Sequence, residues 1–307
     1  MAFTESFMLE PLAPFSLELS AQIFAGLNPA VRCFVDGVFS QVLHVNGCLV
    51  LAKIASKGTV EAPKLQIQLT SNQPVTEQTK RAAKELIEYI FNLNYDLKAV
   101  YRQTENDPVM AKITRQLCGF KYPTTATVFE SLVDSIVEQQ ISIKIARTIE
   151  ERLAERFGDK LEINVACYYA FPTPPNMVAA SIGAIRACGL SQRKAEYIYG
   201  VAKAITDSAL DLEAMKTNPD ITAIIAELDA LKGIGVWTAE LTIYRGMQSL
   251  DVLPADDFGI RRVISHYYCG DKPIEAAEAR EVAKLWSGWQ GLAAFYLLAA
   301  EANGVTV

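Results

Sequence analysis

The spacing of hydrophobic residues changes along this chain near residue 92, and this change constrains the fold more than any other feature. The earlier part carries short β-prone runs, and the dipeptide Asn46-Gly47 between two of them predicts a β-hairpin. A helix is predicted at 76–89, where apolar residues recur at helical spacing. The predicted strands lie at 31–34, 41–44, 48–54 and 64–69. We therefore expect residues 1–94 to form a small α+β domain, an antiparallel sheet with a helix.

Helices are predicted for most of the chain after residue 94. Thr127 and Glu130 form a capping box, and apolar residues behind it recur at helical spacing to about Gln139. The other predicted helices lie at 142–158, 176–187, 191–205, 219–231, 237–247, 257–268, 274–286 and 292–301. We therefore expect residues 95–307 to form an all-α region.

The composition is typical of a folded protein that does not enter a membrane. Half of the 307 residues are hydrophobic and 21% are charged, which is enough to bury sizeable cores. The N-terminus lacks a basic-then-apolar segment, and no stretch reaches the roughly 18 apolar residues that a membrane span needs. The sequence has six cysteines without a Cys-x-x-Cys pair and only two histidines, so it lacks the ligand pattern typical of a zinc or iron–sulfur site. We expect a cytoplasmic protein.

A tight turn between two predicted helices is the first candidate functional feature. It reads Leu231-Lys-Gly-Ile-Gly-Val-Trp237. Glycines there would let the backbone approach a phosphate group closely, and the next helix would point its free amides at that phosphate. An ordinary turn between helices with a glycine C-cap has the same pattern, so the segment alone does not identify a function.

Two other polar motifs stand at predicted helix ends. Adjacent acids, Asp256 and Asp257, precede an apolar helix, where one could cap the helix and the other could simply be solvated. Gln139 and Gln140 lie between two helices, where bulky polar side chains could probe a nucleic acid duplex or form a plain polar turn. Taken singly, each motif fits a structural role at least as well as a functional one.

In their order along the chain, the motifs resemble the helix–hairpin–helix (HhH-GPD) superfamily of DNA glycosylases and, within it, the DNA-3-methyladenine glycosylase II branch. The matching segments are Phe129-Glu-Ser-Leu-Val-Asp-Ser-Ile-Val-Glu-Gln-Gln-Ile-Ser142, Gly189-Leu-Ser-Gln-Arg-Lys-Ala195, Leu231-Lys-Gly-Ile-Gly-Val-Trp-Thr-Ala239 and Asp251-Val-Leu-Pro-Ala-Asp-Asp257. The resemblance covers residues 95–300, and residues 1–94 resemble the family's sheet domain in length and pattern only. It implies an α+β sheet domain followed by a mostly α-helical glycosylase fold, whose two helical subdomains flank an active-site cleft.

The resemblance assigns catalysis to Asp257, which follows the hairpin at the family's distance, with Asp256 in reserve. A fixed carboxylate would stabilise the positive charge that develops on the deoxyribose as the N-glycosidic bond breaks, and could orient the attacking water. The bifunctional branch has a lysine nucleophile after the hairpin's G-x-G-x, where this chain has Trp237. The resemblance therefore implies a monofunctional glycosylase without lyase activity.

A pocket for an alkylated purine such as 3-methyladenine is also implied by the resemblance. Trp237 would line it, because the face of an aromatic ring suits a cationic methylated base. The alternative is that this tryptophan packs in the core at a helix start. The other contributors to the pocket wall would be Phe258, Tyr296 and Phe295.

Contacts with duplex DNA are implied at the hairpin and the glutamine turn. Gln140 would fill the gap left by a flipped-out nucleotide, with Gln139 beside it, although the alkylation branch often has an apolar wedge there. Backbone amides near Gly233 and Gly235 would bind phosphate, and Lys194 would add positive charge. Because such an anchor uses the backbone, it is compatible with a net charge of −6, although DNA-binding surfaces are normally basic.

The resemblance further implies a monovalent cation, Na⁺ or K⁺, bound by the main-chain carbonyls of Asp229, Leu231 and Ile234. We expect no other cofactor and no iron–sulfur cluster. The expected partner is double-stranded DNA with a damaged base, bound by a monomer.

Two other functions stay open. The same fold could act on oxidised or deaminated bases. Trp286-Ser-Gly-Trp-Gln290 keeps the tryptophans but lacks the arginine that the family often has near the C-terminus, so the resemblance does not define the pocket wall beyond Trp237. The chain could also be a catalytically silent DNA-binding protein. The aspartate at the required spacing, together with Trp237, argues against that function.

Overall fold

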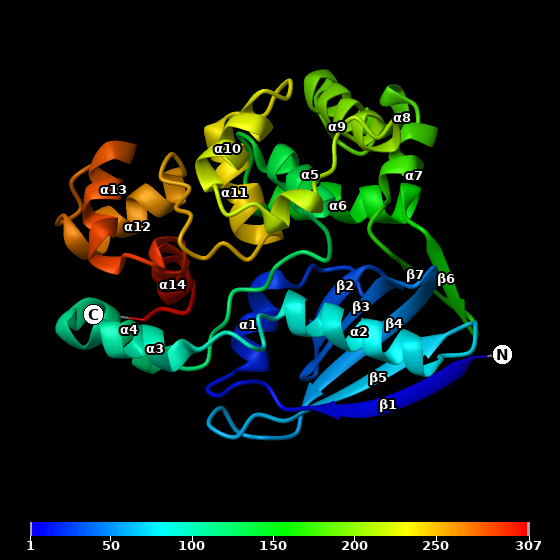
Figure 1. The fold of residues 1–307 in the computed structure, drawn as a ribbon, viewed down its shortest axis with the longest axis horizontal. Helices are drawn as coiled ribbons and strands as arrows, with labels where there is room; N and C mark the ends of the chain where they lie inside the picture. Colours follow the sequence, from blue (N-terminus) through cyan, green and yellow to red (C-terminus); the bar gives the residue numbers. More distant parts are fainter. Residues whose placement is uncertain (1, 306–307) are drawn as a thin grey trace.

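A five-stranded antiparallel sheet forms the N-terminal part of the computed structural model, which describes residues 2–305 (Figure 1). The strand order is β1-β5-β4-β3-β2. Asn46 and Gly47 connect β3 to β4 with φ angles of 49° and 74°, as a two-residue type I′ turn requires. This confirms the predicted hairpin. The strands are β1 (Phe3–Leu9), β2 (Arg32–Val35), β3 (Val38–Val45), β4 (Cys48–Ser56) and β5 (Leu65–Ser71).

Helices α1 (Leu17–Phe24) and α2 (Glu77–Ile90) pack on the same face of this sheet. Alternate residues of each strand point toward them, as in β5, where Leu65 and Ile67 are buried and Gln66 between them is exposed. The predicted helix corresponds to α2. Neither β1 nor α1 has a counterpart among the predicted elements.

The helices that follow form two subdomains with separate hydrophobic cores. Helix α11 contributes to both, because Leu241 and Tyr244 belong to one core while Ala239 and Ile243 belong to the other. The first subdomain holds α5 (Val128–Glu138), α6 (Ile143–Phe157), α7 (Pro174–Ala179), α8 (Ile182–Arg186), α9 (Gln192–Thr206), η2 (Ala214–Thr217), α10 (Ile221–Asp229) and α11 (Val236–Gly246). The second holds α3 (Leu97–Gln103), η1 (Thr104–Asn106), α4 (Pro108–Gln116), α12 (Phe258–Tyr268), α13 (Ala276–Ala283), η3 (Lys284–Trp286) and α14 (Gln290–Ala302).

The expectation that residues 95–307 are all-α is wrong in one place. Strands β6 (Lys160–Ile163) and β7 (Ala166–Tyr169) form a hairpin. Leu161 of this hairpin is fully buried against Val42 and Leu51, which point away from α1 and α2. The hairpin therefore covers part of the second face of the N-terminal sheet, a long-range contact that local periodicity does not reveal.

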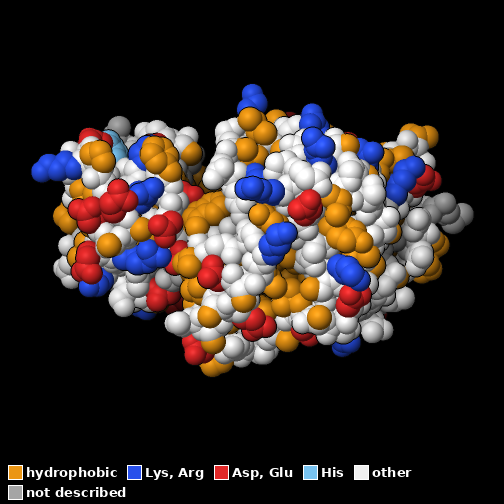
Figure 2. Space-filling model, turned by 90° about the horizontal axis from the view of Figure 1, so that it is seen from above, with side chains coloured by type: hydrophobic (Ala, Val, Ile, Leu, Met, Phe, Trp, Pro, Cys, Tyr) orange, Lys and Arg blue, Asp and Glu red, His pale blue; other side chains and the backbone are white. Residues whose placement is uncertain are grey.

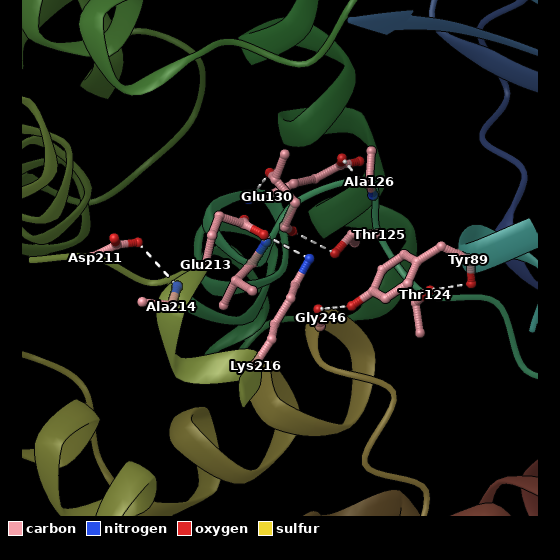
Figure 3. Close-up of polar contacts among 12 residues, drawn as sticks. Tyr89, Thr124, Thr125, Ala126, Glu130, Asp211, Glu213, Ala214, Lys216 and Gly246 are labelled. Atoms are coloured by element: carbon pink, nitrogen blue, oxygen red, sulfur yellow. Dashed lines mark hydrogen bonds and ion pairs between the residues drawn. The ribbon is translucent and has the colours of Figure 1, made fainter. Parts of the chain in front are cut away.

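Polar contacts hold the segment that joins α4 to α5 (Figure 3). The Thr124 hydroxyl donates to the main-chain carbonyl of Tyr89 in α2 at 3.0 Å, and the Tyr89 hydroxyl donates to the carbonyl of Gly246 at 2.5 Å. The Glu213 carboxylate accepts the Val128 amide at 2.8 Å. The C-terminal end of α11 is thus held to α2, and the first turn of α5 is held to Glu213 at the start of η2. No helix described here has the length and hydrophobicity to cross a membrane.

Candidate active site

Asp257 caps α12 and also faces the start of α11. Its Oδ1 accepts the Ile260 amide at 3.0 Å, while its Oδ2 accepts the indole Nε1–H of Trp237 at 3.2 Å. The capping role and the functional role suggested by the sequence are therefore compatible, because they use different oxygens. The two contacts fix the half-buried carboxylate between two helix N-termini.

Asp256 has a different environment from its neighbour. Its side chain is 55% exposed, and its Oδ2 lies 3.8 Å from Nη1 of Arg280 on α13. The structure thus brings Asp257, and not Asp256, into contact with Trp237.

The hairpin between α10 and α11 depends on Gly233. The φ of this residue is 86°, and a Cβ atom there would lie 2.1 Å from the ring of Tyr197 on α9. Both the left-handed backbone and the close approach require glycine. Gly235 occupies the N-cap position of α11 and has no side chain to bind the first amides of that helix. Such amides are suited to an anionic ligand.

The two glutamines of the preceding turn have different environments. The Gln139 side chain donates from Nε2 to the carbonyl of Gly233 at 3.0 Å and to Oγ1 of Thr238 at 3.1 Å. It therefore ties this turn to the hairpin. Gln140 is exposed and has a φ of 57°, which is uncommon for a residue other than glycine.

Lys194 lies under this turn. Its Nζ donates to the carbonyls of Val137 at 2.9 Å and of Gln139 at 2.5 Å, at the C-terminal end of α5, where a positive charge is favourable. Burial lowers the pKa of Lys194. The structure thus shows a support for the turn, and direct contact of this lysine with DNA stays a prediction.

The predicted pocket residues are only partly brought together. Phe258 directly follows Asp257 and is 74% exposed. Tyr296 is fully buried in the second core, and its hydroxyl donates to the carbonyl of Phe120 at 2.6 Å. The expectation that Tyr296 lines the pocket is therefore corrected, because α14 is enclosed by its subdomain. Phe295 is buried too, stacked on Tyr244 with ring centroids 4.3 Å apart.

Two charged residues near the site were missed by the sequence motifs. Glu240 of α11 is buried, and its Oε1 accepts a hydrogen bond from Nη2 of Arg280 at 2.7 Å. Burial raises the pKa of Glu240, and Arg280 opposes this rise. In the sequence, Glu240 could have been noticed as an acid three residues after Trp237 in an otherwise mostly apolar segment. Its partner Arg280 lies forty positions further on, so the sequence gives no indication of the pair.

The carbonyls predicted to bind a cation lie at the end of α10 and in the hairpin. The Leu231 carbonyl accepts the Ile234 amide at 3.1 Å, which closes the turn. Within residues 2–305, no three His, Cys, Asp or Glu side chains are grouped so that they could hold a metal ion.

The site lies where the two helical subdomains meet. Figure 2 shows an indentation between the lobe that contains α12 and α13 and the rest of the molecule, with hydrophobic side chains at its base. Trp237 comes from the helix shared by both cores, and Asp257 comes from the second subdomain. Lysine and arginine side chains are scattered over the larger lobe in this view and do not form one basic patch.

Comparison with known proteins agrees with this arrangement. Residues 133–288 match the family model described as "HhH-GPD superfamily base excision DNA repair protein". A DNA-3-methyladenine glycosylase of Bacillus subtilis is 26% identical over 85% of this chain and 86% of its own length. The DNA-3-methyladenine glycosylase 2 of Escherichia coli is 30% identical over 58% of this chain and 60% of its own length. The solved 3-methyladenine DNA glycosylase of Archaeoglobus fulgidus superposes with a TM-score of 0.86 at 26% identity, covering 98% of this chain and all of that one.

Proposed function

Because this chain belongs to the HhH-GPD superfamily of base excision DNA repair proteins, we propose that it is a monofunctional DNA glycosylase for alkylated purines such as 3-methyladenine. It would act on duplex DNA and leave an abasic site. The observation that carries the proposal is the contact between Trp237 and Asp257 at two helix N-termini. The similarity to proteins named DNA-3-methyladenine glycosylase supports the substrate class.

Asp257 is the catalytic residue of this proposal. When the bond between C1′ and the base nitrogen breaks, its electron pair leaves with the base and positive charge develops on the sugar. A carboxylate held in place stabilises that charge without reorganising. Water then adds to C1′ and gives its proton to the carboxylate or to solvent.

Trp237 has two parts in this reaction. Its indole N–H orients Asp257, and its ring offers an aromatic face to a cationic methylated base. Phe258, exposed beside Asp257, offers a second ring. Since position 237 carries no amine, an imine with C1′ cannot form there, which supports hydrolysis without strand cleavage.

DNA binding would use the backbone more than basic side chains. The N-terminus of α11 at Gly235 would bind a phosphate, and Gln140, exposed in its turn, would enter the gap left by the flipped-out nucleotide. The carbonyls of Asp229, Leu231 and Ile234 are neutral oxygen donors, which suit a monovalent cation that would hold the hairpin in shape. We propose that the protein acts as a monomer.

Release of free base from methylated duplex DNA tests this function. We expect the wild-type protein to release methylated adenine and to leave strands that break only after alkali, while Asp257→Asn releases almost none. Asp271→Asn, an exposed acid at the far end of α12, serves as the control. Release from oxidised or deaminated duplexes instead would change the substrate class. Duplex binding without base release from any lesion would show a DNA-binding protein without catalysis.

A further inference from the structure

Two contacts connect α11 to the Asp256-Asp257 segment, and the site described above uses only one of them. Trp237 and Glu240 are three residues apart on α11 and therefore lie on neighbouring positions of one helix face. Trp237 contacts Asp257 directly. Glu240 is connected to Asp256 through Arg280.

Arg280 belongs to α13 and reaches both acids with different nitrogens. Its Nη2 lies 2.7 Å from Glu240 Oε1, and its Nη1 lies 3.8 Å from Asp256 Oδ2. A guanidinium group can do this because its donors are spread over a rigid plane, whereas an ammonium group is a single point of charge. Arg280 thus connects three elements that are distant in sequence.

Glu240 is an unfavourable residue in this place unless it has a partner. Its side chain is 8% exposed, and its Oε2 has no hydrogen-bond partner among residues 2–305. A buried carboxylate is strongly destabilising when unpaired, and a paired one seldom adds stability over a hydrophobic residue. Stability alone therefore does not explain the pair, whereas control of the neighbouring segment does.

We propose that Glu240 and Arg280 are positioning residues that hold the Asp256-Asp257 segment against α11, so that Asp257 keeps its Oδ2 directed at Trp237. This inference rests on the function proposed above. Neither residue needs to touch the substrate, and Arg280 acts only through Asp256. The helix cap made by the other oxygen of Asp257 does not depend on this contact.

The test combines single-turnover base release at saturating enzyme with the Kd for the same duplex. We expect Arg280→Ala to slow release about 10- to 100-fold, because a catalytic group misplaced by about 1 Å loses that much rate. Its Kd should stay within about twofold of wild type. Arg280→Lys should recover part of the rate, and Glu240→Ala should resemble Arg280→Ala. Lys284→Gln, which removes an exposed ion pair with Glu281 just beyond α13, is the matched control.

A second measurement does not depend on activity. The chain has three tryptophans, so its indole N–H groups give three resonances in a ¹H–¹⁵N spectrum, and Trp237→Phe identifies one of them. We expect Arg280→Ala to shift that resonance and Arg280→Lys to return it toward the wild-type position. If the resonance shifts but the wild-type protein releases no base, the positioning role stands and the proposed function fails.

Three results would overturn the positioning role. Arg280→Ala could keep both the wild-type rate and the wild-type indole resonance. It could instead keep the rate at saturation while raising the Kd in a salt-dependent way, which would show a phosphate contact. An unshifted indole resonance with a slowed reaction would place the effect of Arg280 elsewhere.

Discussion

The indole Nε1 of Trp237 donates a hydrogen bond to Oδ2 of Asp257 across 3.2 Å, while Oδ1 of the same carboxylate caps α12. One oxygen of the Asp257 carboxylate therefore stabilises the start of α12, and the other faces Trp237 in the candidate active site. These two roles can be separated by mutation.

Asp257→Asn should affect catalysis far more than stability. Asparagine caps a helix about as well as aspartate, but its one oxygen cannot also accept the indole N–H of Trp237, so the free energy of unfolding should fall by about 1–3 kcal/mol. Base release should fall at least about 100-fold, because the charge that stabilises the transition state is gone. Asp257→Ala should lose about 1 kcal/mol in addition. Thermal unfolding and single-turnover kinetics measure both, and near-normal activity of the asparagine variant would contradict the assignment.

Trp237→Phe should keep an aromatic face and lose the hydrogen bond to Asp257. Hydrogen bonds to charged groups contribute about 1.5–3 kcal/mol, so we expect the rate of base release at saturation to fall by about tenfold or more. The KM for methylated DNA should change little. A large rise in KM with an unchanged rate would mean that the indole binds the base without orienting the carboxylate.

The glycines of the hairpin should differ in their response to alanine. Gly233→Ala introduces a side chain where φ is 86° and where the Tyr197 ring blocks it, so we expect a loss of more than about 2 kcal/mol of stability. At Gly235, a Cβ atom would have no other described atom within 4 Å. Gly235→Ala should therefore fold with a loss of at most about 1 kcal/mol, yet bind duplex DNA more weakly if phosphate approaches this backbone. Equal Kd values for Gly235→Ala and wild type would place the phosphate elsewhere.

Gln140→Gly should make the protein more stable and less active. The residue has a φ of 57°, a conformation that glycine adopts without strain, so stability should rise by up to about 1 kcal/mol. The side chain that would fill the duplex is removed, so base release from paired lesions should fall. Release from a lesion in an already unpaired strand should fall less. An equal loss on both substrates would argue against a role for Gln140 in nucleotide flipping.

We expect stability to depend on pH through a group of buried and half-buried acids between the sheet and helices α5 and α6. Asp134 of α5 and Glu150 of α6 each have a carboxylate oxygen without a hydrogen-bond partner among the described residues. They line a small cavity together with Gln41, Glu130 and Arg32. Burial raises the pKa of Glu150 to about 8, with nearby Glu138 adding to the rise and the Arg32 charge opposing it.

The folded state binds the proton of the Glu150 carboxyl group more tightly than the unfolded state does. The protonated carboxyl group therefore contributes its full share to the free energy of unfolding below pH 4.5, and this share is lost as the pH rises through 8. Glu150→Gln should therefore flatten the fall in stability between pH 5 and pH 8. Between pH 5 and pH 8, the free energy of unfolding of this variant should rise relative to that of wild type by at least about 1.4 kcal/mol, which corresponds to one pKa unit. Chemical denaturation at both pH values measures this gain. Glu85→Gln, an exposed site on α2, should leave the slope unchanged, and an unaltered slope in Glu150→Gln would show that Glu150 is ionised in the folded protein.

The sequence predicted those elements that are determined by residues only a few positions apart, such as turns and helix caps. The Asn46-Gly47 turn is one, since both residues adopt the positive φ that the dipeptide favours. The start of α5 is another, where the Thr127 hydroxyl accepts the Glu130 amide at 3.1 Å. The predicted helix at 176–187 is instead two short helices, because Ser181 interrupts it and caps α8.

Features that depend on distant partners were not predicted. The β6–β7 hairpin is stabilised by the far face of the N-terminal sheet, and Tyr296 is buried because the other helices of its core enclose α14. Glu240 and Arg280 belong together only once α11 and α13 are placed in space. Within the candidate site, the family resemblance pointed to Asp257, while its hydrogen bond to Trp237 required the structure.

Helix α11 belongs to both helical cores, and this limits how the protein can move. Closing or opening the two subdomains by a hinge would pull one face of that helix out of a close-packed interior, and such interiors resist continuous deformation. The distance between the hairpin and Asp257 is therefore built into the fold. If the chain binds duplex DNA as proposed, we therefore expect the duplex, rather than the angle between the two subdomains, to change shape in the complex.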